Sequence, residues 1–182
     1  MAIDLKPIPP PIETVMTDQN GIVTPPWANF FNNIYRFQVY TAPDYIRPSS
    51  VTLNTGGSTS SLSDLQTLLD GNTYDIDEVT GVGAINLEIA FTNIKYIKHV
   101  WVSLWYEGSA THAIRIQMYN YDTTDWDTFH TVSTTLDYEL HTVPIIQDTN
   151  YISGGNAIVR LYHTESGNAS HDLYIDYVGI GH

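Results

Sequence analysis

The chain has 182 residues, 42% of them hydrophobic and 12% aromatic, so it is long enough to bury a sizeable core without disulfides, and it contains no cysteine. Twenty Asp and Glu against seven Lys and Arg give a formal net charge of −13, which argues against nucleic acid or an anionic membrane as the main partner. We see no basic segment leading into an apolar stretch at the start and no run of about 18 apolar residues, so neither an export signal nor a membrane span is predicted.

Residues 1–40 are predicted to form an extended, Pro-rich anchoring arm. Proline fixes φ and removes a backbone donor, which favours a polyproline-like conformation. Further on, Thr24 is placed to cap a short helix with one apolar face, and so small an apolar element with little core of its own indicates docking onto a partner or a neighbouring protomer. The residues expected to dock are Pro9, Pro10, Pro11, Trp27, Phe30, Phe31 and Ile34.

Residues 41–68 are predicted to hold a linker and the first strands. The stretch 54–61 is flexible by composition, and Ser61 or Ser63 can cap a single helical turn over residues 62–69. Residues 69–182 then alternate short β-rich segments with Gly, Asn, Asp and Ser. The predicted strands are 86–91, 97–106, 113–121, 129–134, 139–145, 157–163 and 173–180.

Several of these strands alternate apolar and polar residues, as a strand with one buried face does. On the last strand, the pattern places Leu173, Ile175 and Tyr177 on one face. Seven or eight such strands without intervening helices predict two packed antiparallel sheets, that is, an all-β jelly-roll β-sandwich.

Two parts of the chain resemble known families. Residues 69–180 resemble the galactose-binding-like jelly roll of discoidin-type and carbohydrate-binding modules, through Leu69-Asp70-Gly71-Asn72, Leu87-Glu88-Ile89-Ala90-Phe91, His99-Val100-Trp101-Val102 and Leu173-Tyr174-Ile175-Asp176-Tyr177-Val178. The opening is similar to that of tailed-bacteriophage appendage and minor virion proteins, through Thr17-Asp18-Gln19-Asn20-Gly21 and Trp27-Ala28-Asn29-Phe30-Phe31.

Together the two resemblances imply a virion structural protein of the tail-fibre, spike-adaptor or capsid-decoration type. Its arm would attach to capsid or tail proteins, and its sandwich would project from the particle, with a homotrimer favoured. The protein would be assembled in the host cytoplasm and carried on the extracellular virion. The alternative function is a carbohydrate-binding module or receptor-binding domain that recognises host glycans.

Three tryptophans are candidates for a glycan or protein interface. Trp101 and Trp105 share one side of a predicted strand, opposite Val100, Val102 and Leu104. That side is open to three interpretations: it is covered by protein, it is an interface, or it binds sugar. Trp126 lies in the polar segment 122–127, expected to be a loop, and is the stronger sugar candidate because loops carry binding; the alternative is that it covers the core.

Oxygen ligands gather near a turn at Asp70, Asn72, Asp75 and Asp77, which is the ligand type that calcium favours. The galactose-binding-like resemblance implies the same, since those modules often hold a structural calcium near their early Asp-Gly turn. A plain Asp-Gly turn is the alternative, and no other cofactor is expected.

The seven histidines are scattered, without the spacing of a zinc motif. His163 and His171 flank a loop and would converge if that loop is a hairpin, although a loop-closing hydrogen bond is the expected role there. The chain has no nucleophile elbow, P-loop, dinucleotide turn or metalloprotease helix, so we predict that it is not an enzyme.

Overall fold

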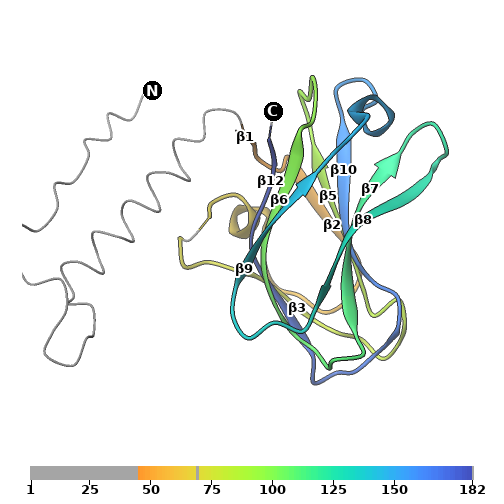
Figure 1. Cartoon of the computed structure of the whole chain (residues 1–182). Helices are drawn as coiled ribbons and strands as arrows, with labels where there is room; N and C mark the ends of the chain where they lie inside the picture. Colours follow the sequence, from red (N-terminus) through yellow and green to blue (C-terminus); the bar gives the residue numbers. More distant parts are fainter. Residues whose placement is uncertain (1–44, 69, 182) are drawn as a thin grey trace, which may run out of the picture. The chain divides into compact units, whose positions relative to one another are not determined.

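The structure, a computed structural model, describes residues 45–68 and 70–181 (Figure 1). These residues form one compact unit. The predicted anchoring arm, with its docking residues Pro9, Pro10, Pro11, Trp27, Phe30, Phe31 and Ile34, lies outside the described residues, so arm docking and trimerisation stay predictions. No helix in the described part of the chain has both the length and the apolar character needed to cross a bilayer.

The unit is a jelly-roll β-sandwich, as predicted, built from two five-stranded antiparallel sheets. In sheet 1, β1 and β3 both pair with β12, and β6 and β9 follow; sheet 2 has the order β2-β5-β10-β7-β8. The strands of sheet 1 are β1 (Tyr45–Ile46), β3 (Tyr74–Asp77), β12 (Asp172–Gly181), β6 (His99–Glu107) and β9 (Glu139–Pro144). Those of sheet 2 are β2 (Ser50–Thr55), β5 (Ile85–Phe91), β10 (Ala157–His163), β7 (Ala113–Asn120) and β8 (Asp125–Ser133).

The core lies between the two sheets and is made by one side of each strand. On β5, Ile85, Leu87, Ile89 and Phe91 are fully buried while the residues between them face outward, which is the period of two that the sequence predicts. Val100, Val102 and Leu104 face the same core from β6. Each fully buried side chain of this size contributes about 1.5–3 kcal/mol by leaving water.

The last strand departs from the predicted alternation at a β-bulge. Its pairing with β6 shifts between Ile175 and Tyr177, because Asp176 is inserted there. Leu173 and Ile175 face the core as predicted, whereas Tyr177 turns to the outer side, where its ring lies 5.7 Å from that of Tyr45. The prediction that Tyr177 shares the face of Leu173 is therefore wrong, and Val178 and Ile180 take the core positions after the bulge.

The segment before residue 69 contributes to the sandwich as well as linking to it. The expected helical turn is a 3₁₀ helix, η1 (Leu62–Leu65), shorter than the range 62–69. The backbone N–H of Ser61 donates to Asp64 Oδ2 at 2.7 Å, and Leu65 is fully buried in the core. A second 3₁₀ helix, η2 (Asp148–Tyr151), precedes β10.

One end of the sandwich is closed by a two-stranded ribbon, β4 (Gly81–Val82) paired with β11 (Ser166–Gly167). A Cβ at Gly167 would overlap the backbone oxygen of Val79, so only glycine fits there without movement. The close approach at Gly167 brings the loop after β3 against the loop between β10 and β12.

Candidate functional site

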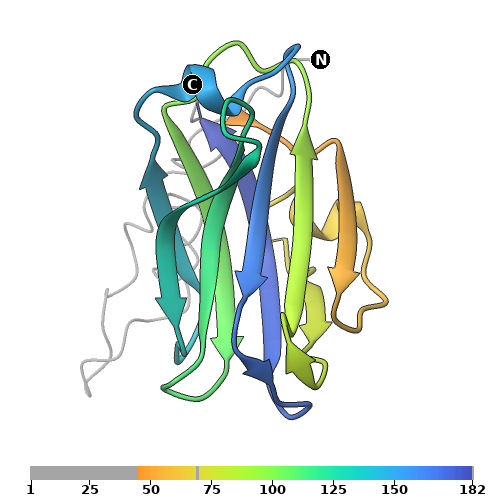
Figure 2. The same cartoon turned by 90° about the vertical axis from the view of Figure 1, so that its right-hand side faces the viewer.

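Sheet 2 presents an outer face that combines aromatic rings with charged and amide side chains; Figure 2 looks onto this sheet. Strand pairing places Arg160 of β10 between Glu88 of β5 and Gln117 of β7, and it places Tyr119 of β7 opposite Trp126 of β8. We call this set, together with Tyr162, the Trp126 surface: Glu88, Gln117, Tyr119, Trp126, Arg160 and Tyr162.

The guanidinium of Arg160 is fixed between two rings. Its Cζ atom lies 4.0 Å from the ring centroid of Trp126 and 4.4 Å from that of Tyr162, both within cation–π range. Its Nε donates a hydrogen bond of 2.8 Å to Gln117 Oε1, and Gln117 Nε2 in turn donates to Thr128 Oγ1 at 2.9 Å. These contacts leave the two terminal nitrogens of Arg160 without a hydrogen bond or ion pair to any described residue.

The charges of this surface are mixed although the chain as a whole is acidic. Burial lowers the pKa of Arg160, but a guanidinium stays protonated at neutral pH because its ordinary pKa is above 12. Glu88 lies across the strand pair from Arg160 and accepts a hydrogen bond of 2.8 Å from Asn54 Nδ2. The outer face of sheet 2 therefore carries a guanidinium that can donate hydrogen bonds (Arg160), a carboxylate that can accept them (Glu88) and the aromatic rings of Trp126 and Tyr162.

The structure corrects the expected location of Trp126. It lies on strand β8 and not in a loop, because that strand begins at Asp125 and continues the pairing of β7 as far as Asn120. Its flanking aspartates resemble a turn in sequence, but β8 is the edge strand of sheet 2, where polar residues are tolerated.

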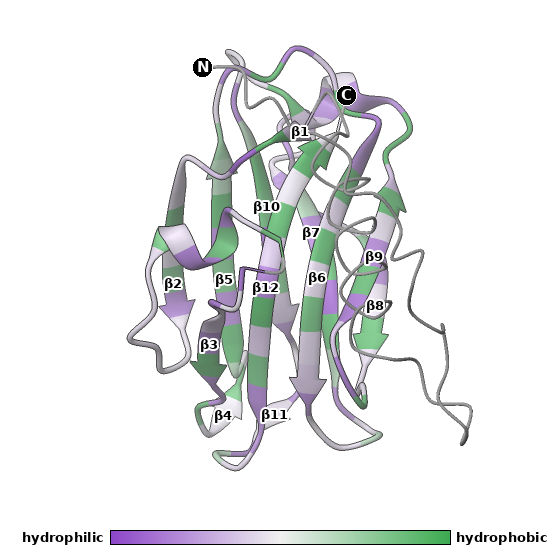
Figure 3. Ribbon diagram, turned by 90° about the vertical axis from the view of Figure 1, so that its left-hand side faces the viewer, coloured by the Kyte–Doolittle hydropathy of each residue, from purple (hydrophilic) through white to green (hydrophobic). Residues whose placement is uncertain are grey.

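Trp101 and Trp105 share the outer face of sheet 1, opposite Val100, Val102 and Leu104, as the sequence predicts. Figure 3 looks onto this sheet, with β12, β6 and β9 in front. Trp101 lies 4.6 Å from the ring of His99, and Trp105 is stacked on Tyr174 at 4.9 Å between centroids. These rings mainly contact other rings. The choice among cover, interface and sugar binding for this face stays open.

Of the four predicted calcium ligands, the carboxylates of Asp70, Asp75 and Asp77 do not form a group with ligand atoms within 4.8 Å of one another. Asp70 Oδ1 accepts a hydrogen bond of 2.9 Å from the backbone N–H of Asn72, which closes the Asp-Gly turn. Asp75 and Asp77 are exposed on β3, where they alternate with buried residues. The arrangement fits the turn alternative and provides no ligand cage in the described part of the chain.

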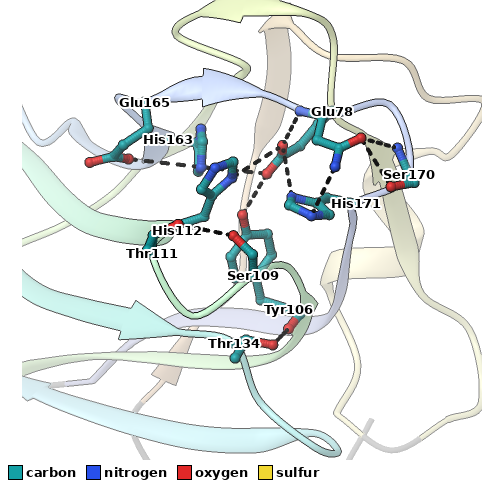
Figure 4. A network of polar contacts seen from close by, with 11 residues as sticks. Glu78, Tyr106, Ser109, Thr111, His112, Thr134, His163, Glu165, Ser170 and His171 are labelled. Atoms are coloured by element: carbon teal, nitrogen blue, oxygen red, sulfur yellow. Dashed lines mark hydrogen bonds and ion pairs between the residues drawn. The ribbon is translucent and has the colours of Figure 1, made fainter.

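A second polar group lies at the ribbon-closed end of the sandwich, where Glu78, His112, His163 and His171 converge; we call it the Glu78 cluster (Figure 4). Glu78 follows β3, His112 precedes β7, His163 ends β10 and His171 precedes β12. Within the described residues, the only group of three or more His, Asp or Glu side chains with ligand atoms within 4.8 Å of one another is Glu78, His112 and His163.

The carboxylate at the centre of the cluster is fully buried and held by two hydrogen bonds. The Tyr106 hydroxyl donates to Glu78 Oε1 at 2.5 Å, and the backbone N–H of Asn168 donates to Oε2 at 2.8 Å. Burial raises the pKa of Tyr106, and the bond to Glu78 raises it further, so the phenol keeps its proton. For His163 the effect of burial is the opposite: it lowers the pKa and so favours the neutral imidazole, although the nearby Glu78 carboxylate acts to raise that pKa.

The sequence indicated only a part of this cluster. The loop between His163 and His171 brings both histidines beside Glu78. Within the loop, Asn168 Nδ2 contacts His171 Nε2 at 3.3 Å, whereas the ring of His163 makes no hydrogen bond, so the expected loop-closing role fits His171 and not His163. His112 and Glu78 come from distant segments and carry no local motif. Their convergence follows from the pairing of strands across both sheets, and no spacing in the sequence signals it.

No family model matches the chain, and no curated protein does. Among solved structures, a family 29 carbohydrate binding module is similar over 75% of this chain and 86% of its own, with 14% identity and a TM-score of 0.48. A variant of the module CBM29-2 complexed with cellulohexaose has 14% identity and a TM-score of 0.45, over 75% of this chain and 89% of that one. Similarity at this level does not identify a ligand for this chain.

Proposed function

We propose that the β-sandwich is a carbohydrate-binding domain whose ligand lies on the Trp126 surface. The observation that carries the proposal is the Arg160 guanidinium, held between Trp126 and Tyr162, whose terminal nitrogens make no hydrogen bond or ion pair with a described residue. Binding sites for small molecules combine apolar and aromatic area with a few precisely placed polar groups, and this surface has both.

The chemistry of a sugar matches these groups one by one. The C–H face of a pyranose packs on a flat aromatic ring, which offers a large apolar area at small conformational cost. Its hydroxyls accept hydrogen bonds from a guanidinium and donate them to a carboxylate, here Arg160 and Glu88. Because Gln117 already holds Arg160 in place, little side-chain entropy remains to be lost on binding.

The direct test is a glycan array probed with the full-length chain, followed by calorimetry with any oligosaccharide that binds. Hexasaccharides of glucose and of mannose are suitable first probes. Trp126→Ala is expected to weaken binding at least about tenfold, equivalent to about 1.4 kcal/mol. Arg160→Lys keeps the charge but removes the planar fork, and we expect it to weaken binding as well.

The matched control is Trp105→Ala, which removes the same ring from the outer face of sheet 1. It should leave the affinity unchanged if the sugar lies on sheet 2. Loss of binding in Trp105→Ala with retention in Trp126→Ala would move the site to sheet 1. Absence of binding to every glycan on the array would refute the proposal.

Attachment to a virion is a separate prediction, because it depends on residues 1–40. A carbohydrate-binding sandwich displayed on a particle by such an arm would serve host recognition. Particle incorporation of a chain that lacks residues 1–40 would contradict the attachment prediction and would leave the sugar-binding proposal untouched.

A further inference from the structure

Hydrogen bonds hold Glu78 to Tyr106 and Asn168, but they do not explain its contacts with the imidazoles of the Glu78 cluster. His163 Nε2 lies 3.5 Å from Glu78 Oε1, and His112 Nδ1 lies 3.8 Å from Oε2. Hydrogen bonds between an imidazole and a carboxylate are about 2.7–2.9 Å long when one partner is charged, so neither contact is one. Four buried nitrogens of the cluster have no hydrogen-bond partner: Nδ1 of His112, both ring nitrogens of His163 and Nδ1 of His171.

Such unpartnered atoms are costly in a folded protein, and here one of them from each histidine lies within 4 Å of a Glu78 oxygen. The side chains of Glu78 and His163 are fully buried, and that of His112 is 17% exposed. A buried polar atom without a partner costs free energy because it has lost its water, so each such atom calls for an explanation. A shared ligand that contacts one nitrogen of each imidazole would satisfy those atoms together.

The distances are those of donor atoms arranged around one metal ion. Imidazole nitrogens and carboxylate oxygens bind Zn²⁺ at about 2.0–2.2 Å, and two such donors in a tetrahedral site lie about 3.3–3.6 Å apart. The separations of 3.5 and 3.8 Å, which run to different oxygens of Glu78, are close to this range, and one ligand atom from each of Glu78, His112 and His163 lies within 4.8 Å of the other two.

From these observations we propose that Glu78, His112 and His163 bind a divalent transition-metal ion, with Zn²⁺ as the natural occupant. Two imidazoles and one carboxylate suit zinc better than calcium or magnesium, which prefer oxygen ligands. His171, whose Nδ1 lies 3.4 Å from Glu78 Oε2, adds a third imidazole beside the carboxylate.

The surroundings of the three ligands are built to orient them. Tyr106 and the backbone of Asn168 each hold one oxygen of Glu78, as outer partners of metal-binding carboxylates commonly do. The ligands also come from both layers, because Glu78 follows a strand of sheet 1, while His112 directly precedes one strand of sheet 2 and His163 ends another. The ion would thus cross-link the two sheets in a chain that has no cysteine to do so.

The test begins with the intact chain, stripped by a chelator and then equilibrated with Zn²⁺. Elemental analysis after gel filtration should find one zinc per chain, and the melting temperature should rise by about 5–10 °C at a hundredfold excess over Kd. Ca²⁺ should produce no such rise. Co²⁺ in the same site should give the intense visible absorption of a four-coordinate ion, a readout that needs no variant.

The variant His112→Gln should lose the bound zinc and the thermal shift, since it removes a partly exposed ligand without opening the core. The matched control is His130→Gln, which alters a histidine of the separate pair His130–His141, whose centroids lie 5.0 Å apart. Retention of zinc by His112→Gln, loss of zinc by His130→Gln, or an intact chain that binds no zinc would each overturn the proposal.

Discussion

Removal of the Tyr106 hydroxyl should destabilise the metal-free sandwich measurably. In Tyr106→Phe the ring remains, so no cavity opens, and the change is confined to the 2.5 Å bond to Glu78 Oε1. Hydrogen bonds to charged groups contribute about 1.5–3 kcal/mol, because the buried carboxylate cannot recover its water. For a chain of this size that corresponds to a melting temperature lower by about 3–12 °C.

Urea unfolding of the chelator-treated chain, followed by tryptophan fluorescence, measures this difference as a lower midpoint with an unchanged slope. The matched control is Tyr174→Phe, because its hydroxyl donates a longer bond of 3.3 Å to Asp172 and both residues are partly exposed, so we expect an effect within about 0.5 kcal/mol. In a Glu78→Gln background the cost of Tyr106→Phe should shrink. A Tyr106→Phe midpoint equal to that of the control would refute the reasoning.

Three further predictions concern stability. Phe91→Ala, at a fully buried position of β5, should lower the free energy of unfolding measured with denaturant by about 3–5 kcal/mol. A loss below about 1 kcal/mol would mean that Phe91 is not packed in the core. Gly167→Ala should lower the free energy of unfolding by about 1–3 kcal/mol, because the added Cβ meets the Val79 backbone. Gly57→Ala has more room and should lower it less, and equal losses in the two variants would show that Gly167 is not crowded. Burial, aided by the neighbouring His130, lowers the pKa of His141 in the folded chain. As the pH drops below about 6.5, His141 is therefore protonated more readily in the unfolded chain than in the folded one, and the free energy of unfolding should fall. His141→Gln should flatten this pH dependence of the urea midpoint, and an unchanged slope would count against it.

Local pattern was sufficient to predict most of the strands. The segment 157–163 coincides with β10, and 86–91 differs from β5 by one residue, because β-branched and apolar residues alternate there without interruption. The pattern failed at Tyr177, where one inserted residue reverses the side-chain direction for the rest of the strand. It also failed at Trp126, because an edge strand carries the polar residues that usually indicate a loop.

The candidate sites were less predictable than the strands. Trp126 was identified by its residue type, but its partners Arg160 and Gln117 depend on the register of three strands, which no single segment encodes. The same holds for the Glu78 cluster, whose ligands lie on strand ends that meet only after both sheets have formed. The spacing of the histidines thus indicated only the approach of His163 and His171, and it did not indicate that His112 joins them beside Glu78.

The pairing of the first and last strands has a mechanical consequence. β1 and β12 are antiparallel, and Tyr45 lies opposite Gly181, so the two ends of the sandwich are neighbours at the same end of the domain. A force that pulls these two ends apart would act on the hydrogen bonds between β1 and β12 one at a time, beginning at Tyr45 and Gly181. Sequential loading resists force far less than shear across a whole strand. A tether that runs through both ends would therefore peel β1 away first and leave the faces of the two sheets intact.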